Sequence, residues 1–251
     1  MRSVRTALNV FEGVADRQPV GLSALARDLE LPKATVQRAL TALADAGWLV
    51  QDLLDPGRWS VSARFAVLAD ATPLVQAARI AACPHLAALR DATGETVALF
   101  TIDGDHMALL DGIEGTHVVR AVESQVGPLP IHASAAGRAM LGALPDEDRR
   151  AAVGRLAADG LHRYTDRSIL DVDRLLARVA EASKRGYAVV DREYLDDLCG
   201  IGAAVLGPGG APVAGVALLA PSYRLPTSAV AATGRKVADC ATLIGADLRR
   251  R

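Results

Sequence analysis

A two-helix pattern near the N-terminus constrains this chain more than any other feature. Residues 21–40 read GLSALARDLELPKATVQRAL, which is a short apolar helical stretch, a Leu-Pro-Lys turn and a second helical stretch. Pro32 suits the first turn of the second helix, where a missing N–H costs no hydrogen bond, and Gly47 suits the left-handed position just past its end. Two short helices joined by a tight turn are typical of a helix-turn-helix.

The flanking segments complete a winged domain. Apolar residues at helical spacing predict a first helix from Ser3 onward, and Ser23 is a candidate cap for the second helix. Residues 48–52 and 58–61 read as two strands, and Asp55-Pro56-Gly57 supplies the turn between them. We therefore predict a winged helix-turn-helix over residues 1–63.

The second helix of the motif has a polar face that suits DNA. On a helical wheel Val36, Leu40 and Leu43 share the buried face, so the polar side chains point away from the domain. Recognition helices present their N-terminal residues to the major groove, where Gln pairs with adenine and Arg with guanine. The candidates are Thr35, Gln37, Arg38 and Thr41 for bases, and Arg5, Lys33, Arg58 and Arg64 for phosphates. The alternatives are a solvated surface helix and a winged helix that binds protein.

Charge and cysteine usage limit what else the chain can do. The net charge is −1, and residues 1–64 hold eight Lys/Arg against seven Asp/Glu, so any DNA attraction must come from a local patch. The three cysteines form no CxxC pair and the five histidines show no metal-ligand spacing, so we expect no metal and no cofactor. No signal peptide and no membrane span can be read, which predicts a cytoplasmic protein.

The rest of the chain mixes helices and strands. Thr72-Pro73 interrupts a long helical stretch, because proline disfavours helical geometry in the residue before it. We predict a linker helix over residues 64–73 and an α+β domain with a mainly antiparallel sheet over residues 74–251. The expected strands are 96–102, 107–111, 118–123, 187–191, 201–206 and 213–220, and the expected helices are 134–142, 146–158, 171–185 and 225–248.

Several motifs, in order along nearly the whole chain, resemble the IclR family of bacterial transcriptional regulators. They include RTALNV at residues 5–10, LPKATVQR at 31–38, TGETV at 93–97, VGPLPIHASAAGRAML at 126–141 and RGYAV at 185–189. The resemblance implies a ligand-responsive, sequence-specific DNA-binding regulator, acting as repressor or activator. It also implies a C-terminal GAF-like α/β effector domain, and homodimers or homotetramers on double-stranded operator DNA.

The same resemblance implies an effector pocket, and here the chain departs from the family's pattern. The pocket positions fall on Ala135, Ala136, Val190, Asp191, Gly200, Ala217 and Leu219. Cys199 lies one place before the family's usual cysteine, and Val190, Gly200, Ala217 and Leu219 lack the family's polar groups. We therefore expect a small effector that is fairly apolar or aromatic, since apolar linings favour area burial. The rival interpretation is a degenerate domain without a ligand, in which Ser134 simply caps a closely packed helix.

An enzyme remains the competing class. His132, Cys199 and Asp191 could be drawn as a Cys-His-Asp set, but nothing in the local sequence supports it. Glycines and apolar strands around Cys199 instead predict a small, buried and inert cysteine.

Overall fold

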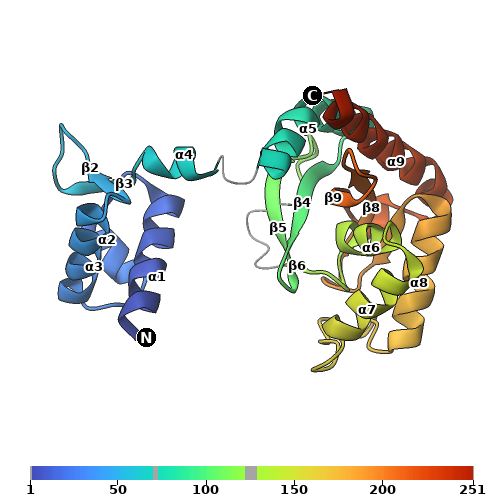
Figure 1. Cartoon of the computed structure of the whole chain (residues 1–251), viewed down its shortest axis with the longest axis horizontal. Coiled ribbons are helices and arrows are strands. Elements are labelled where there is room, and N and C mark those ends of the chain that lie inside the picture. The colour runs from blue at the N-terminus through green and yellow to red at the C-terminus, as the bar shows by residue number, and fades with distance from the viewer. Residues whose placement is uncertain (1, 70–72, 122–128, 251) are drawn as a thin grey trace. The chain divides into compact units, whose positions relative to one another are not determined.

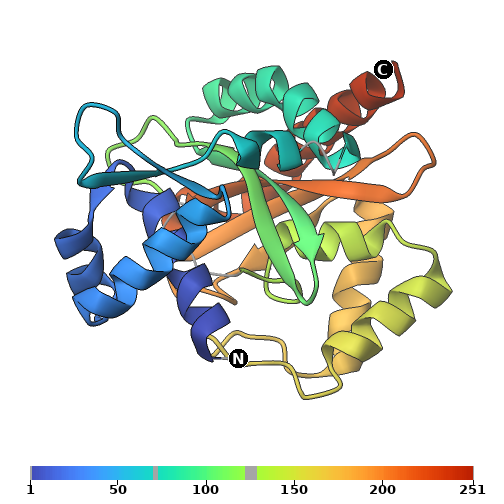
Figure 2. The same ribbon diagram turned by 60° about the vertical axis from the view of Figure 1, so that its left-hand side comes forward.

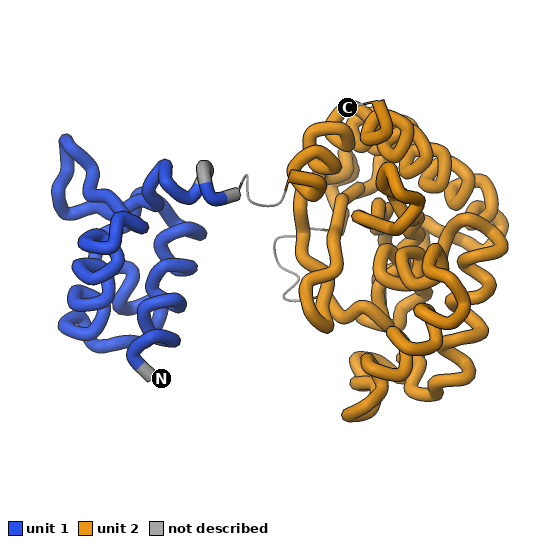
Figure 3. The backbone as a smooth tube through the Cα atoms, viewed as in Figure 1, with its two compact units in different colours: residues 1–72 blue, residues 73–251 orange. Residues whose placement is uncertain are grey.

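The computed structural model describes residues 2–69, 73–121 and 129–250. The chain divides into two compact units, residues 1–72 and 73–251 (Figure 3). Each unit has its own hydrophobic core.

Unit 1 is a winged helix-turn-helix, as predicted (Figure 1). Its helices are α1 (Arg2–Arg17), α2 (Leu22–Asp28), α3 (Lys33–Asp45) and α4 (Arg64–Ala69). Its antiparallel sheet has the order β1 (Val20–Gly21), β3 (Arg58–Val61), β2 (Leu49–Gln51). Val14, Leu25, Val36, Leu40 and Trp59 are buried between the helices and the wing.

Local contacts explain where α3 ends and why α1 tolerates a glycine. Gly47 has φ +78°, the left-handed geometry predicted for the residue past a helix end. Arg64, a predicted phosphate contact, is exposed, and its Nη1 also donates to the carbonyl of Ala46 at 2.8 Å, at the end of α3. A Cβ on Gly13 would lie 2.8 Å from Leu25 Cδ1, so glycine in α1 lets α2 approach closely.

Unit 2 is built on a six-stranded antiparallel sheet, which confirms the predicted α+β class. The strand order is β6 (Leu129–Pro130), β5 (His106–Ile113), β4 (Thr96–Asp103), β9 (Pro212–Pro221), β8 (Leu198–Leu206), β7 (Ala188–Asp191). Helices α5 (Pro73–Thr93) and α9 (Thr227–Arg250) cover one face, and a 3-10 turn at Ser222–Arg224 precedes α9. Helices α6 (Ala135–Gly142), α7 (Asp146–Leu156) and α8 (Val172–Arg185) lie on the other face (Figure 2).

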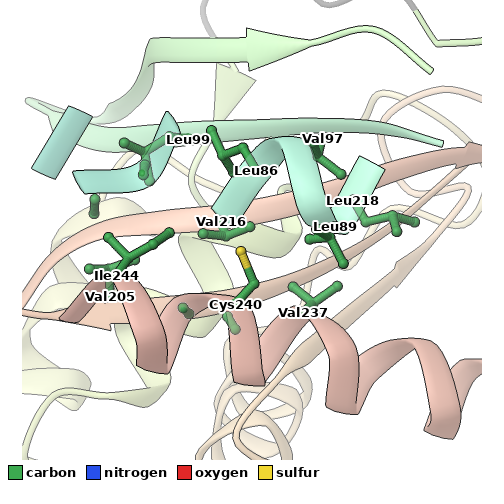
Figure 4. Packing of buried hydrophobic residues seen from close by; sticks show 14 of the residues in the cluster. Leu86, Leu89, Val97, Leu99, Val205, Val216, Leu218, Val237, Cys240 and Ile244 are labelled. Carbon is green, nitrogen blue, oxygen red and sulfur yellow. The ribbon is translucent and has the colours of Figure 1, made fainter. Parts of the chain in front are cut away.

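The two faces of this sheet carry separate cores. On the α5/α9 face, Leu86 and Leu89 of α5 meet Cys240 and Ile244 of α9 over Val216 and neighbouring strand residues (Figure 4). On the α6 face, the core includes Phe100, Met140, Ile169, Leu175 and Val179. Because side chains alternate along a strand, each sheet residue belongs to one core or the other.

Two local expectations were wrong, and one short strand was missed. Residues 118–121 form no strand, and 122–123 lie outside the described residues; Val118 and Val119 are exposed. Ser23 does not cap α2, whose cap residue is Gly21 without a side-chain bond. The two-residue strand β1 was not expected. None of the described helices is long and apolar enough to cross a bilayer.

Candidate functional site

The exposed face of α3 presents the predicted DNA-contacting residues together. Lys33, Gln37, Arg38 and Thr41 are exposed and Thr35 is half-buried, while the opposite face packs into the core of unit 1. Gln37 Nε2 donates to Thr41 Oγ1 at 3.3 Å, and Arg38 Nη2 donates to Thr35 Oγ1 at 3.4 Å. These contacts hold the polar groups in place along about one and a half turns of helix.

The predicted phosphate contacts differ in how free their charges are. Within the described part of the chain, the side chains of Arg5 and Lys33 make no hydrogen bond and no ion pair. Arg58 is engaged: its Nη1 donates to Pro19 O at 2.9 Å and its Nε lies 3.3 Å from Asp55 Oδ2. Arg58 therefore stabilises the wing. The two cations without a described partner, Arg5 and Lys33, lie in the N-terminal parts of α1 and α3.

Six of the seven predicted effector residues gather at the start of α6. Val190 pairs with Gly200 and Gly200 with Leu219, which places these three side by side across β7, β8 and β9. Ala217 lies two residues from Leu219 on the same face. Ala135 and Ala136 open α6 above them, and a Cβ on Gly200 would lie 3.2 Å from the Cβ of Ala135.

Asp191 does not join this group. It is the next residue after Val190 and pairs with Cys199, so both side chains point to the α5/α9 face. The Cys199 thiol donates to Asp191 Oδ1 at 2.9 Å, and Arg167 Nη1 donates to Asp191 Oδ2 at 2.6 Å. A hydrogen bond from Arg192 is the main reason that the pKa of Asp191 is lowered.

The backbone of α6 rests directly on the sheet. A Cβ on Gly202 would lie 2.5 Å from the carbonyl oxygen of Ala135 and the amide nitrogen of Ala136. Ser134 caps the helix, because its Oγ accepts from Gly137 N–H at 3.0 Å. The neighbouring floor is apolar, formed by Ala98, Phe100, Met107, Ile131, Ala217 and Leu219. These six residues are apolar and mostly buried, and none of them carries a polar group that could orient a ligand.

A buried ion pair behind α6 was not anticipated from the sequence. Arg138 Nη1 donates to Glu193 Oε1 at 2.9 Å and Nη2 donates to Glu193 Oε2, while Nε donates to His132 O at 2.6 Å. The two side chains are 1% and 11% exposed. The pair ties α6 to the loop after β7, and the only sequence signal was an arginine in an otherwise apolar helix.

His132 does not join Cys199 and Asp191, the other two residues of the enzyme alternative. His132 Nε2 lies 3.2 Å from the carbonyl oxygen of His162, and its ring packs against Tyr164. Burial lowers the pKa of His132 and raises the pKa of the Cys199 thiol to about 12. A protonated thiol that is hydrogen-bonded to a carboxylate and has no histidine among its described partners is not an activated nucleophile.

Comparison with known proteins assigns both units. Residues 3–53 match the family model described as the IclR helix-turn-helix domain. Residues 74–246 match the family model described as bacterial transcriptional regulator IclR C-terminal. The transcriptional repressor IclR of Escherichia coli K12 is 29% identical over 242 residues, 94% of this chain and 86% of that protein.

Solved structures show the same fold. An IclR homologue from Microbacterium hydrocarbonoxydans, complexed with 4-hydroxybenzoate, aligns with a TM-score of 0.77 at 22% identity, covering 99% of this chain and 100% of that one. The IclR structure from Thermotoga maritima aligns with a TM-score of 0.75 at 20% identity, covering 99% of both chains.

Proposed function

This chain belongs to the IclR family of bacterial transcriptional regulators, and we propose that it reads its operator through the exposed face of α3. The observation that carries this proposal is the cluster of Lys33, Gln37, Arg38 and Thr41 on the outward face of the second motif helix. The repressors among its relatives favour repression as the output.

The roles of the DNA-contacting residues follow from their geometry. Gln37 and Arg38 are long, exposed and near the N-terminal end of α3, so they can reach base edges in the major groove. Arg5 and Lys33 carry unpaired positive charge and suit phosphates. With a near-neutral unit 1, one such surface binds weakly, and we propose a homodimer that doubles it on a two-fold related operator.

Replacing Arg38 by alanine should weaken operator binding by about 1–3 kcal/mol and relax specificity at one base pair. The side chain bonds only Thr35 within the described residues, so its loss leaves the core of unit 1 intact. Gel-shift titration against the operator and single-base variants measures both effects. Unchanged operator affinity would remove Arg38 from the interface.

Lys33→Ala is the matched contrast, because it removes one charge from the same helix. We expect equal weakening on operator and unrelated DNA, with the salt dependence of log K reduced by about one unit. A loss confined to the operator would contradict the phosphate role of Lys33.

We further propose that the effector binds on the α6 face, beside the start of α6 and next to the apolar residues around it. Val190, Gly200, Ala217 and Leu219 supply contact area without polar side chains, which suits an aromatic or otherwise apolar acid. A carboxylate suits the amide end of α6. The relative bound to 4-hydroxybenzoate supports this class of effector.

Thermal unfolding in the presence of candidate acids tests the effector class. Aromatic acids at about 100 times their Kd should stabilise unit 2 by about 2.7 kcal/mol, and two- and three-carbon acids should not. Stabilisation by the small acids alone would contradict an apolar site. Stabilisation by none of them would favour the degenerate, ligand-free domain.

A further inference from the structure

A cavity lies at the β7 edge of the same sheet, between α8 and the segment that leads into α9. Its volume is about 520 Å³, within the range of about 300–1,000 Å³ usual for small-molecule sites. Strands β7 and β8 contribute Val189, Asp191 and Cys199, and α8 contributes Arg178 and Arg185. The segment that leads into α9 supplies the remaining wall, including Ser222, Leu225 and Thr227.

The helix wall of this cavity carries excess positive charge. Arg178 and Arg185 share a single acidic partner, Glu181, at 3.1 and 3.6 Å. Both arginines are about half exposed, so their guanidinium groups can turn toward a ligand at little cost.

The strand wall is closer to neutral. Arg167 and Arg192 face Asp191, and Asp197 adds a second carboxylate near Arg192. Glu193 is already neutralised by Arg138. The net positive charge of the cavity therefore sits on α8, where a negatively charged group would find two guanidinium donors.

The rest of the lining suits an apolar body attached to that negative group. Leu225 is buried, and Val189 and Val230 are half-buried against the core between α5, α9 and the sheet. The hydroxyls of Ser222 and Thr227 lie on the same wall and can accept or donate. Arg192 is fixed at the rim, because its backbone has φ +58° and its side chain bonds both oxygens of Asp191.

Asp191 and Cys199 are each one residue away from Val190 and Gly200 along the strands, and this explains which way their side chains point. Side chains alternate across a strand, so Val190 and Gly200 face α6 whereas their neighbours Asp191 and Cys199 face this cavity. At these four positions the two faces differ in chemistry: Val190 and Gly200 have no polar side chain, whereas Asp191 and Cys199 do.

We propose that this cavity is a second ligand site, which binds an organic carboxylate with an apolar body between α8 and the start of α9. It is distinct from the effector site proposed at the start of α6 and does not depend on it.

Benzoate is the probe, and isothermal titration calorimetry on the full-length protein is the first measurement. Arg178→Gln combined with Arg185→Gln should raise the benzoate Kd at this site by about tenfold, because two charge-assisted contacts are lost. Arg174→Gln combined with Lys184→Gln removes the same charge from exposed positions of the same helix, outside the cavity lining. That control should leave the Kd within about twofold, since exposed charges act weakly at a distance.

The position of the bound acid gives the second measurement. In crystals grown with 4-bromobenzoate, the anomalous signal of bromine should lie between α8 and α9, beside Val189 and Leu225. Bromine beside Ala217 and Leu219 alone would overturn this proposal and leave the α6-face effector site standing. Equal affinities of the two double variants, or no benzoate binding, would overturn it as well.

Discussion

Glu193→Gln should lower the free energy of unfolding of unit 2 by about 3–5 kcal/mol, because it leaves the charge of Arg138 buried without a counter-charge. The Arg138 side chain is 1% exposed and donates to Glu193 through both terminal nitrogens, so water cannot replace the lost partner. Arg138 also donates to the carbonyl of His132, which links the start of α6 to the loop after β7. Loss of the Arg138–Glu193 ion pair should therefore also destabilise α6, the helix beside the proposed effector site.

The placement of aromatic residues lets this prediction be measured in the intact protein. Both tryptophans, Trp48 and Trp59, belong to unit 1, and all four tyrosines belong to unit 2. In urea titrations, the tyrosine near-ultraviolet signal should shift to lower denaturant in the variant, while the tryptophan fluorescence transition stays in place. A parallel shift of both signals would show that the two units unfold as one.

Two further variants distinguish the stability contribution of a buried ion pair from that of an exposed ion pair. Glu181→Gln breaks the exposed contact with Arg178 and should cost less than about 1 kcal/mol. Arg138→Met combined with Glu193→Gln removes both charges and should recover most of the loss, since the penalty comes from an uncompensated charge. If Glu193→Gln and Glu181→Gln cost the same, the buried pair contributes no more than a surface one.

Local signals in the sequence were enough to predict most of the fold. The Leu-Pro-Lys turn, Gly47 and the wing turn fixed unit 1, because each acts over a few residues. What was missed depends on distant partners: β1 forms only by pairing Val20 with Trp59. The apolar pair Val118-Val119 has strand propensity, but no described strand pairs with it.

The candidate sites show the same division between local and distant information. The exposed face of α3 could be predicted from helical spacing alone. Spacing also located Val190 and Asp191, but only the pairing of β7 with β8 shows that they face opposite sides of the sheet. The Arg138–Glu193 pair joins residues 55 positions apart, and the bond from Arg64 to the carbonyl of Ala46 also joins residues that are distant in the sequence.

Gly202→Ala should be the most damaging single methyl addition among the glycines under α6. A Cβ there would lie 2.5 Å from the carbonyl oxygen of Ala135 and the amide nitrogen of Ala136, which are backbone atoms and cannot rotate away. Overpacking of this kind costs about 1–3 kcal/mol, and we expect the upper end of that range because the whole helix must move.

Two other glycines give a graded series for the same measurement. At Gly200 the added methyl would meet the Cβ of Ala135 at 3.2 Å, so Gly200→Ala should cost less than Gly202→Ala. At Gly209 nothing lies within 4 Å, and Gly209→Ala should change stability by less than about 0.5 kcal/mol. The tyrosine-detected urea midpoint should therefore fall in the order 202, 200, 209, with the largest loss first.

The same series of variants tests whether the close packing of α6 on the sheet matters for ligand binding. Because Gly202→Ala displaces the first turn of α6, it should also weaken binding of an aromatic acid on the α6 face, whereas Gly209→Ala should not. Binding at the α8–α9 cavity should be unaffected by either change, since neither glycine lines it. Equal midpoints for Gly202→Ala and Gly209→Ala would show that α6 can shift freely, and the close seating of α6 would then not constrain the proposed effector site.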